Sequence, residues 1–414
     1  MVNFARTMRL PQCLCALGLA LALQPAFAAA GAAEAPPRGA LVIAGGAVRP
    51  DNAVVWQRIV QLAGGPGARI AVMPSAAAHP ERSGANLVAA LNQYGASAFV
   101  VPLAPNLKGR DYRRDADDPA IAAAIRGASG VYFAGGDQAL ITRALVHADG
   151  SRSAALEAIW DVYRRGGVIA GSSAGAAIMS STMYYDAKTV LGTLSVGVND
   201  GRELAPGLGF IGNAVFVDQH LLARGRFARM LPAMLKKGYK LGLGVDENTA
   251  IVVSGQREVE VIGYQGALLV DLSQATVDRS QAEFNLSNAR LSYLDHGDRY
   301  DLATRHYTPS QDKADGGKVD AQAPLLHEPV YSADILGHNA VLVVMARLID
   351  NSETQAIGIA SAGPGEPRPE LGFEFKFTRD AASTGYQSAT MEAYSILDIR
   401  LDVRPVRIAR PWYQ

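Results

Sequence analysis

Short apolar runs alternate with helix-like segments through the first part of this chain, and the runs end in glycine, proline or small residues. Continuous apolar strands separated by helices are typical of a parallel sheet that is covered on both faces. We therefore expect an α/β fold with a mostly parallel sheet, whose functional sites gather at the carboxyl ends of the strands. The expected strands are residues 40–44, 69–73, 98–102, 130–133 and 168–170, and the expected helices are residues 54–62, 83–91, 119–126, 139–147 and 156–163.

A polar stretch divides the rest of the chain. It carries Gly316-Gly317 and is typical of a linker. We expect a catalytic α/β domain at residues 39–308, a linker at residues 309–324, and a small α+β appendage at residues 325–414 whose role the sequence does not indicate. Before the linker, the expected strands are residues 214–217, 241–253 (interrupted by Asp246-Glu247-Asn248), 258–262 and 267–272; after it, a helix is expected at residues 333–349 and strands at residues 355–359, 372–378 and 396–406.

The first 28 residues resemble a secretory signal peptide. Arg6 and Arg9 precede an apolar stretch at residues 14–23, and Ala26-Phe27-Ala28 supplies the small-x-small pattern of a cleavage site. The apolar stretch falls short of the roughly 20 residues that span a bilayer. We therefore expect cleavage after Ala28, a spacer at residues 29–38, and an exported protein, periplasmic or extracellular, without a membrane anchor.

Composition argues against several classes of function. The chain has 39 basic and 39 acidic residues, a balance that disfavours nucleic acid as the main partner. Both cysteines, Cys13 and Cys15, lie in the leader, so the mature chain would have no disulfide, no thiol nucleophile and no cysteine-ligated metal. No set of residues has the spacing of metal ligands, and we expect neither a metal nor another cofactor. Covalent catalysis would therefore use an oxygen nucleophile.

Ser173 is the candidate nucleophile. It lies in Gly-Ser-Ser-Ala-Gly at residues 171–175, directly after an expected strand, and a strand that enters such a turn before a helix is the pattern of a nucleophile elbow. The backbone N–H groups of Ala174 and of Gly136, which lies in a second glycine turn, are candidates for an oxyanion hole. Small-residue turns after strands also serve packing alone, so catalysis needs a base and an acidic partner elsewhere in the chain.

His220 is the candidate general base. Among the seven histidines of the chain, it is the one that lies just past an expected strand end and directly after two polar residues. A general base of this kind needs a third group that accepts its other ring proton. Glu247, at the bend within residues 241–253, is the preferred orienting group, and Asp186, which is closer to the elbow in sequence, is the alternative. A satisfied structural histidine is the competing interpretation of His220.

Three arginines follow the candidate base closely in sequence: Arg224, Arg226 and Arg229. Arginine binds carboxylates bidentately, which favours recognition of a substrate that carries carboxylates. Arg226 and Arg229 would lie together on one face of a helix, and a solvated helix face is the alternative interpretation. Asp218 and Gln138 are suited to accept hydrogen bonds from a cationic group.

Four segments carry a family resemblance, in order and sensibly spaced. They are Phe-Ala-Gly-Gly-Asp-Gln at residues 133–138, Gly-Ser-Ser-Ala-Gly-Ala at 171–176, Asp-Gln-His at 218–220 with the three arginines, and Gly-Leu-Gly-Val-Asp-Glu-Asn-Thr-Ala-Ile at 242–251. Together they resemble the cyanophycinases, within the serine-peptidase family that also contains aspartyl dipeptidase (peptidase E). The resemblance covers about residues 40–310 and implies a flavodoxin-like α/β fold related to class I glutamine amidotransferases, and a homodimer. By position it implies that Ser173 is the nucleophile, His220 the base and Glu247 its orienting group.

The resemblance also implies a substrate. Cyanophycinases act on cyanophycin, a poly-aspartate backbone with arginine joined through each β-carboxyl group, and release β-Asp-Arg dipeptides. The leader favours the secreted type of this family, which would act on cyanophycin released by other cells. The alternative is a dipeptidase or isopeptidase of the same fold for acidic or β-aspartyl dipeptides, and a second alternative is an inactive secreted polymer-binding protein. The implied substrate contacts are Gln138, Asp218, Gln219, Arg224, Arg226 and Arg229.

Overall fold

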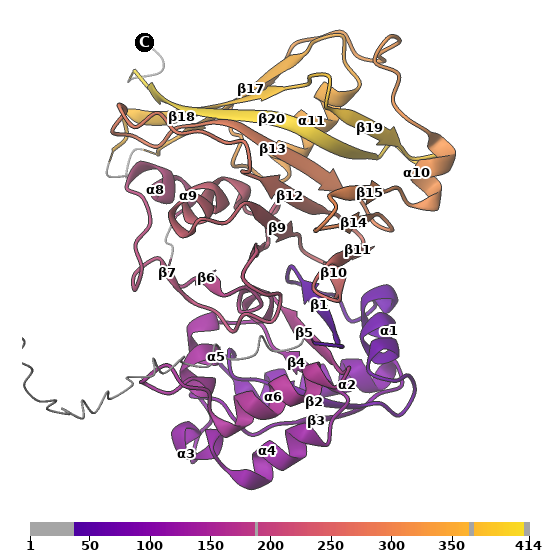
Figure 1. The fold of residues 1–414 in the computed structure, drawn as a ribbon, viewed down its shortest axis with the longest axis vertical. Helices are drawn as coiled ribbons and strands as arrows, with labels where there is room; N and C mark the ends of the chain where they lie inside the picture. Colours follow the sequence, from indigo (N-terminus) through magenta and orange to yellow (C-terminus); the bar gives the residue numbers. More distant parts are fainter. Residues whose placement is uncertain (1–36, 187–188, 364–367, 410–414) are drawn as a thin grey trace, which may run out of the picture. The chain divides into compact units, whose positions relative to one another are not determined.

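The computed structural model describes residues 37–186, 189–363 and 368–409, so the expected signal peptide at residues 1–28 lies outside the described residues. The chain from Pro36 to Gln414 forms one compact unit. Within its described residues, two nine-stranded sheets and a small two-stranded sheet make up the β-structure (Figure 1). Among these same residues, no helix combines the length and the apolar character needed to cross a membrane.

The first large sheet contains the expected parallel strands. β1 (Ala40–Ala44), β5 (Val168–Ser172), β4 (Gly130–Phe133), β2 (Arg69–Met73) and β3 (Ser97–Val100) lie side by side in that order, each parallel to its neighbour. On the other side of β1 the sheet continues through antiparallel β10 (Thr249–Ser254), β11 (Glu258–Gly263), β14 (Arg299–Asp301) and β15 (His306–Thr308). The predicted α/β fold is confirmed, and the antiparallel strands make the sheet mixed.

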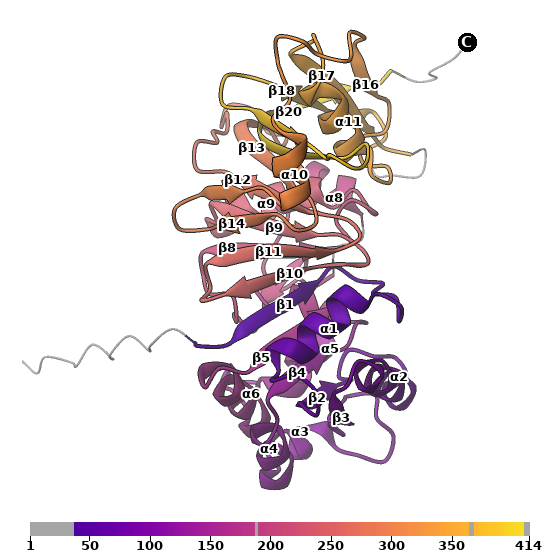
Figure 2. The ribbon, with the colours of Figure 1, turned by 90° about the vertical axis from the view of Figure 1, so that its right-hand side faces the viewer.

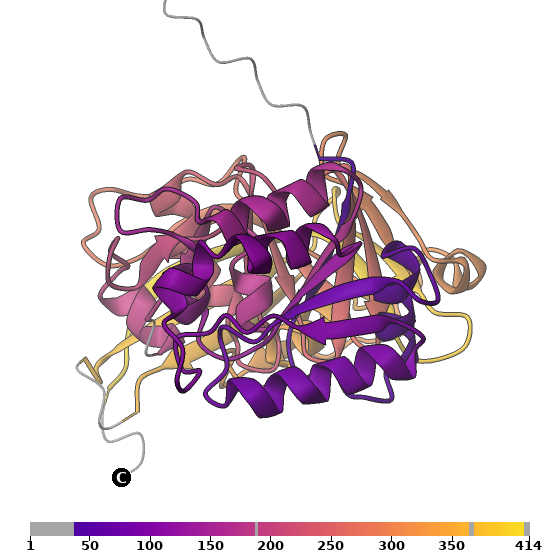
Figure 3. The same cartoon turned by 90° about the horizontal axis from the view of Figure 1, so that it is seen from below.

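Helices cover both faces of the parallel strands. Successive strand residues point to opposite sides, and apolar side chains on both sides pack against helices. Val42 and Val72 pack on one face, and Leu41 and Ile43 pack on the other. Figure 2 shows the first helix alongside β1 and β10, and the view from below shows helices on both sides of the strands (Figure 3). The first face holds α1 (Ala53–Leu62) and α2 (Pro80–Gln93); the second holds α4 (Pro119–Arg126), which α3 (Tyr112–Ala116) precedes, α5 (Gln138–Leu145), α6 (Ala154–Arg164) and the short α7 (Ala174–Ala177).

The second large sheet begins with two parallel strands and is antiparallel through most of the rest. One of its faces packs against α9 (Phe227–Lys237) and α11 (Ala340–Ile349) in a shared apolar core. Before this sheet in the chain, β6 (Thr182–Tyr184) pairs antiparallel with β7 (Leu204–Pro206), and the helix α8 (Val190–Ser195) lies between them in sequence. The strand order is β8 (Val215–Gln219), β9 (Leu241–Val245), β12 (Ala267–Asp271), β13 (Leu286–Leu294), β20 (Tyr394–Arg407), β18 (Leu371–Thr378), β17 (Gln355–Ser361) and β16 (Val330–Ser332), with β19 (Thr384–Gln387) paired to β20.

Residues 241–253, expected as one interrupted strand, form two strands in different sheets. β9 belongs to the second sheet and β10 to the first, and Asp246, Glu247 and Asn248 form the crossing between them. Asn248 has a φ of 54°, in the left-handed region that asparagine tolerates better than most residues. The expected interruption is therefore the passage of the chain from one sheet to the other, and it carries Glu247.

The C-terminal segment, expected as a separate appendage at residues 325–414, extends the second sheet instead. β20 pairs with β13 on one side and with β18 on the other, because its alternating apolar residues complete the core under α9 and α11. The expected linker at residues 309–324 contains α10 (Gln311–Gly316), whose Lys313 is fully buried and pairs with Asp295 at 2.7 Å. A buried charge needs such a partner, so this segment is held against the body of the protein.

Candidate active site

Ser173 lies at the sharp turn between β5 and α7. Its backbone has φ 55° and ψ −108°, a conformation that non-glycine residues rarely adopt and that fits a nucleophile elbow. The flanking glycines are required by space: a β-carbon at Gly171 would stand 2.4 Å from the Gly175 carbonyl oxygen, and one at Gly175 would stand 2.5 Å from the Phe133 carbonyl oxygen. The Ser173 backbone N–H donates to the Ala44 carbonyl at 3.0 Å, which holds the turn against β1.

His220 follows β8 and lies beside the elbow. Its Nε2 is 2.8 Å from the Ser173 Oγ, and its Nδ1 is 2.5 Å from the Glu247 Oε1. Each ring nitrogen therefore has one partner. Nδ1–H can donate to the carboxylate while Nε2 accepts from the serine hydroxyl, which is the tautomer that a general base requires. The structure thus brings the three residues singled out from the sequence into one line of contacts.

Burial is the largest influence on the pKa of His220 and lowers it. The hydrogen bond with Glu247 raises the pKa, the charges of Arg224 and Arg226 lower it, and the net shift is downward from the ordinary value. A lowered pKa keeps the ring neutral near pH 7, so that Nε2 is free to accept a proton.

A buried asparagine holds the crossing that carries Glu247. Asn52, which is fully buried, donates from Nδ2 to the backbone oxygen and to the Oδ1 of Asn248, both at 2.9 Å. The Asn248 backbone N–H donates to the Gly46 carbonyl at 2.8 Å. Asn52 also caps α1 by accepting from the Val55 N–H. The start of α1, the loop after β1 and the Glu247 turn therefore form one hydrogen-bonded unit.

Asp186, the alternative orienting group, lies elsewhere. It follows β6 and lines a cavity together with Tyr185 and Glu203. Among the described residues, the carboxylate in contact with His220 is that of Glu247. Of the two candidates, the structure therefore puts Glu247 beside the imidazole.

The two candidate oxyanion donors lie at the ends of neighbouring strands. Ala174 is the first residue of α7, where helix geometry leaves the N–H without an intrahelical acceptor. The second glycine turn comes so close to the elbow that a β-carbon at Gly135 would stand 3.3 Å from the Ser173 Cβ. Gly136 has a φ of 141°, and a β-carbon there would stand 2.0 Å from the Ala76 carbonyl oxygen. Glycine at position 135 lets main chain lie next to the serine, and glycine at position 136 lets the turn pack against the loop at Ala76.

Asp218 and Arg229 bind each other. Arg229 donates from Nε and Nη2 to the two carboxylate oxygens of Asp218, each at 2.6 Å. Asp218 is 2% exposed and Arg229 is 5% exposed. The guanidinium also lies 4.3 Å over the ring of Tyr184, whose hydroxyl donates to the Arg229 backbone oxygen at 2.5 Å. The sequence predicted that Asp218 and Arg229 each contact substrate. The structure differs, because the packing of α9 on β8 buries the two charges against one another.

Arg226 and Arg224 keep free donors near His220. Arg226 donates from Nη1 to the backbone oxygen of Gln219 at 3.0 Å and to its Oε1 at 2.9 Å, which leaves its other guanidinium donors for a further partner. Burial, with a smaller contribution from Arg229, lowers the pKa of Arg226 to about 10, so the group stays charged near pH 7. Arg224 is exposed, and its Nη2 lies 3.8 Å from the Glu247 Oε1.

Gln138, the first residue of α5, is anchored to the β6–β7 hairpin. Its Nε2 donates to the Tyr184 backbone oxygen at 2.7 Å. The amide carbonyl remains as an acceptor. Gln138 therefore has Oε1 available to accept a hydrogen bond from a cationic group.

Sequence reasoning missed two residues of this site. In the sequence, Asn52 has the pattern of a helix N-cap, and it does cap α1. Its second role was missed because the contact with Asn248 joins positions far apart in the chain. Gly46 follows the first expected strand, and its position beside His220 depends on the contact between the loops after β1 and β8, where the His220 backbone N–H donates to the Gly45 carbonyl at 2.8 Å. The glycine pair after the first apolar run was the available signal for Gly46, and Asn52 gave none.

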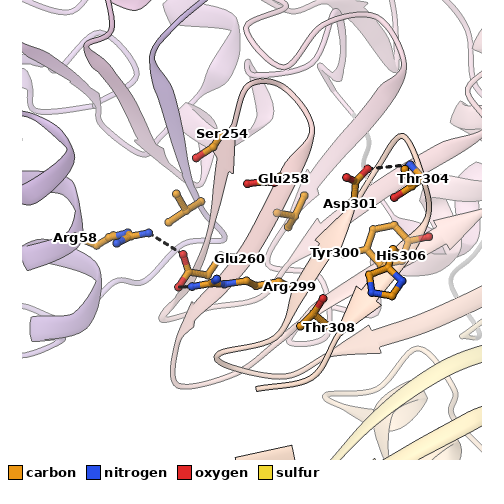
Figure 4. Close-up of a pocket in the computed structure, with 12 residues that line it drawn as sticks. Arg58, Ser254, Glu258, Glu260, Arg299, Tyr300, Asp301, Thr304, His306 and Thr308 are labelled. Carbon is orange, nitrogen blue, oxygen red and sulfur yellow. Dashed lines mark hydrogen bonds and ion pairs between the residues drawn. The ribbon is translucent and has the colours of Figure 1, made fainter. Parts of the chain in front are cut away.

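A separate cavity of about 550 Å³ lies over β10, β11 and β14 (Figure 4). Glu260 points toward two arginines there, with Arg58 at 2.7 Å and Arg299 at 3.6 Å. The cavity is lined by the Ser254 end of β10, whereas the Thr249 end adjoins the crossing that carries Glu247. Among the described residues, no group of three or more histidine, cysteine or acidic side chains could hold a metal ion.

Comparison with known proteins adds family relationships. Residues 40–261, more than half of the chain, match Peptidase family S51. The cyanophycinase of Geminocystis herdmanii is 33% identical over 273 residues, which cover 64% of this chain and 93% of that relative. The cyanophycinase of Trichormus variabilis is 28% identical over 286 residues, which cover 67% of this chain and 90% of that relative.

The solved structures give a fold comparison. The crystal structure of a peptidase from an acI-B1 Actinobacterium aligns with a TM-score of 0.45 at 20% identity, and the alignment covers 64% of this chain and 97% of that one. In both alignments with the cyanophycinases, about a third of the present chain lies outside the aligned region.

Proposed function

The chain belongs to peptidase family S51 and is a serine-type peptidase, and from that premise we propose that it hydrolyses cyanophycin to β-Asp-Arg dipeptides through an acyl-enzyme on Ser173. The observation that carries the proposal is the line of contacts from the Ser173 Oγ through His220 to Glu247. The names of the relatives, which are cyanophycinases, support the choice of polymer. We further propose that the protein is exported, on the strength of its leader at residues 1–28.

Acylation begins with attack of the Ser173 Oγ on a backbone carbonyl carbon of the polymer. His220 Nε2 accepts the hydroxyl proton as the C–O bond forms, and it gives that proton to the amine that leaves when the peptide bond breaks. Glu247 holds Nδ1–H and stabilises the imidazolium. Water then attacks the acyl-enzyme with His220 again as the base, which releases the free acid and restores the serine.

The carbonyl oxygen gains negative charge during both attacks. The backbone N–H groups of Ala174 and Gly136 donate to this oxygen in the proposed mechanism. Donors fixed by the backbone need no reorganisation as the charge forms, and the loss of one such donor typically costs about 10²–10³ in kcat.

Each repeat of cyanophycin offers a carboxylate and a guanidinium. Arg226 and Arg224 are the cationic groups beside His220, and they bind the carboxylate in this proposal, because guanidinium matches it bidentately. Gln219 orients Arg226 through its Oε1. The Oε1 of Gln138 accepts from the substrate guanidinium. The buried Asp218–Arg229 pair supports β8 and α9 beneath the site and does not touch the polymer.

The test is hydrolysis of purified polymer. Protein lacking residues 1–28 is incubated with cyanophycin granules, with and without a chelator, and the soluble products are identified by mass. We expect β-Asp-Arg in both conditions and none from Ser173→Ala. Ser172→Ala is the matched control, since it removes the neighbouring hydroxyl of the same turn and should keep activity. Product release by Ser173→Ala at the wild-type rate would contradict the assigned nucleophile.

Other outcomes favour the alternatives. Intact granules together with rapid cleavage of acidic or β-aspartyl dipeptides would favour a dipeptidase or isopeptidase. Binding of granules without cleavage of either the granules or the dipeptides would favour an inactive polymer-binding protein. Export is tested by cell fractionation of the full chain and of a chain without residues 1–28, with retention of both in the cytoplasm as the contradicting result. The homodimer implied by the family resemblance is tested by light scattering.

A further inference from the structure

The second sheet has one covered face and one open face along its later strands. On β18, Phe373, Phe375 and Phe377 point into the core under α9 and α11. Glu374 and Lys376 alternate with them, and therefore point to the opposite side. This open face belongs to the part of the chain beyond residue 261, where the match to the peptidase family ends.

A shallow hollow of about 630 Å³ lies on this open face. It is lined by β13, β17, β18 and β20, and it contains five charged side chains. Along β20 their signs alternate at every second residue, from Arg400 to Asp402 to Arg404. Across the strands the register sets opposite charges side by side, with Glu374 opposite Arg404 and Lys376 opposite Asp402. The lining residues are Leu286, Ser287, Asn288, Gln355, Ile357, Glu374, Lys376, Arg400, Asp402, Val403 and Arg404.

The charges of the hollow are available for exchange with a ligand. Arg404 donates to Glu374 from Nε at 2.8 Å and from Nη2 at 2.9 Å; its side chain is 68% exposed, and that of Glu374 is 16% exposed. The arginine of this pair lies at the surface, so replacing Arg404 costs little stability. Arg400 reaches Asp402 at 3.1 Å, and the two side chains are 34% and 26% exposed, respectively. No ion pair of Lys376 is found among the described residues.

The composition of the hollow selects among ligand classes. Three cationic and two anionic side chains give it almost no net charge, which disfavours nucleic acid or another polyanion. Its lining includes no aromatic ring on which a sugar or a base could stack. A checkerboard of both signs is complementary to a ligand that carries both signs itself. A zwitterionic polypeptide meets that condition.

We propose that this hollow is a docking surface for cyanophycin, distinct from the active site; the inference rests on the proposed function. An extended poly-aspartate backbone presents every second side chain on one side, at intervals of about 6.6–6.8 Å. Neighbouring charges along β20 are two residues apart and have the same interval. Each arginine branch of the polymer brings a guanidinium for Glu374 and Asp402 and a carboxylate for Arg404 and Lys376.

The docking surface and the active site lie at opposite ends of the strands. β13 runs in the same direction as β9, because both are antiparallel to β12. Glu247 follows the last residues of β9, whereas the hollow lies at the first residues of β13, from Leu286 to Asn288. One granule can therefore occupy the hollow while the end of another chain occupies the active site. Binding at two positions raises the effective concentration of chain ends.

The test separates binding from hydrolysis. Ser173→Ala protein is mixed with cyanophycin granules, the granules are sedimented, and the bound fraction gives an apparent Kd. Adding Lys376→Glu and Arg404→Glu should weaken this Kd by about tenfold or more, since charge reversal sets like charges against the polymer. The matched control is Arg82→Glu with Lys108→Glu, which makes the same change of charge at exposed positions of the other sheet's loops and helices. A neutral version, Lys376→Gln with Arg404→Gln, should lie between wild type and the reversal.

Kinetics give the second readout. In proteins with Ser173 intact, the ratio of granule hydrolysis to hydrolysis of soluble β-Asp-Arg oligomers should fall with the reversal and stay constant with the control. An unchanged Kd and an unchanged ratio in the reversed variant, with an unchanged Tm, would overturn the proposal. So would an equal loss in the control. Failure of the proposed function would appear differently, as absence of product from both granules and oligomers with the unmodified protein.

Discussion

Gly46 packs its Cα against the imidazole of His220: a β-carbon at position 46 would stand 2.2 Å from the His220 Cε1 and 2.5 Å from its Nε2. That same Nε2 lies 2.8 Å from the Ser173 Oγ. Gly46 also has a φ of 125°, which favours glycine. The position of the ring nitrogen that meets the serine therefore depends on the absence of a side chain on the facing loop.

Gly46→Ala should reduce kcat on cyanophycin by about 100-fold or more, because a displacement of about 1 Å between reacting groups can cost that much. The measurement is steady-state kinetics together with thermal unfolding of the same sample. Gly64→Ala is the matched control: Gly64 has a φ of 114°, but no atom lies within 4 Å of a β-carbon there. It carries the backbone strain without the contact. Equal kcat values in the two variants would show that the contact with His220 is unimportant.

Asn52→Ser should separate helix capping from support of Glu247. Serine can still cap α1, but it is too short to donate to Asn248 as Asn52 does. We expect kcat to fall by about tenfold with little change in KM, because the two hydrogen bonds that hold the crossing at Asn248 are lost. Each such bond contributes about 0.5–1.5 kcal/mol of stability, so Tm should fall as well. Asn52→Ala should lose the cap as well, which costs about 1 kcal/mol of stability. Ser153→Ala, which removes the cap of α6, should lower Tm and leave kcat unchanged. A wild-type kcat in Asn52→Ser would refute the positioning role.

The pH dependence follows from the lowered pKa of His220. Activity needs the neutral ring, so kcat/KM should rise with pH through a midpoint below the ordinary histidine value of 6.5. Arg224 is one of the charges that lower this pKa, so Arg224→Gln should move the midpoint to higher pH. Arg299→Gln, far from the ring, should not move it. A midpoint above 6.5 in the unmodified protein would contradict the neutral-base assignment.

Stability should have a matching pH dependence. A histidine whose pKa is lower in the folded than in the unfolded chain binds fewer protons when folded. Protonation therefore stabilises the unfolded state relative to the folded state as pH falls. His220 should therefore cost stability progressively as pH falls from about 6.5 through its lower folded pKa. Chemical denaturation across this range should show a smaller slope of unfolding free energy against pH in His220→Gln than in the unmodified protein.

Arg226 and Arg229 should behave differently on mutation. Arg226→Ala removes a partly buried group with free donors, so kcat/KM should fall by about 10–100-fold, the equivalent of a charge-assisted hydrogen bond, while Tm changes little. Arg229→Ala leaves Asp218 buried without its partner, which typically costs about 3–5 kcal/mol of stability. Thermal unfolding and kinetics of both variants test the contrast. A wild-type Tm in Arg229→Ala would mean that the buried pair is not structural.

The sequence was sufficient to single out Ser173 and His220, because both lie in local patterns. A strand that runs into Gly-x-Ser-x-Gly, and a histidine just past a strand end, can be recognised without knowing what lies beside them. The Asp218–Arg229 pair could not be found in this way. Both residue types suit a zwitterionic substrate, and only the packing of α9 on β8 shows that each satisfies the other.

The crossing of the chain from the second sheet to the first could not be predicted for a related reason. Residues 241–253 are apolar on both sides of Asp246-Glu247-Asn248, and apolarity reports burial without saying in which sheet a strand is buried. Of the C-terminal strands, β17, β18 and β20 were recognised individually, whereas β16 and β19 were not. The pairing of β20 with β13 joins residues about a hundred positions apart. Contacts over such separations leave no periodic trace in the sequence.

The crossing at Glu247 has a mechanical consequence. Ser173 follows a strand of the first sheet, His220 follows a strand of the second, and Glu247 sits on the chain that passes between them. The proton path of the proposed reaction thus bridges two sheets, each of which has its own ladder of backbone hydrogen bonds. A slip of one sheet past the other by a fraction of a strand interval would break the path while leaving both sheets hydrogen-bonded. Catalytic activity therefore depends on the alignment of the two sheets. It should be lost in mild denaturant, before either sheet begins to unfold.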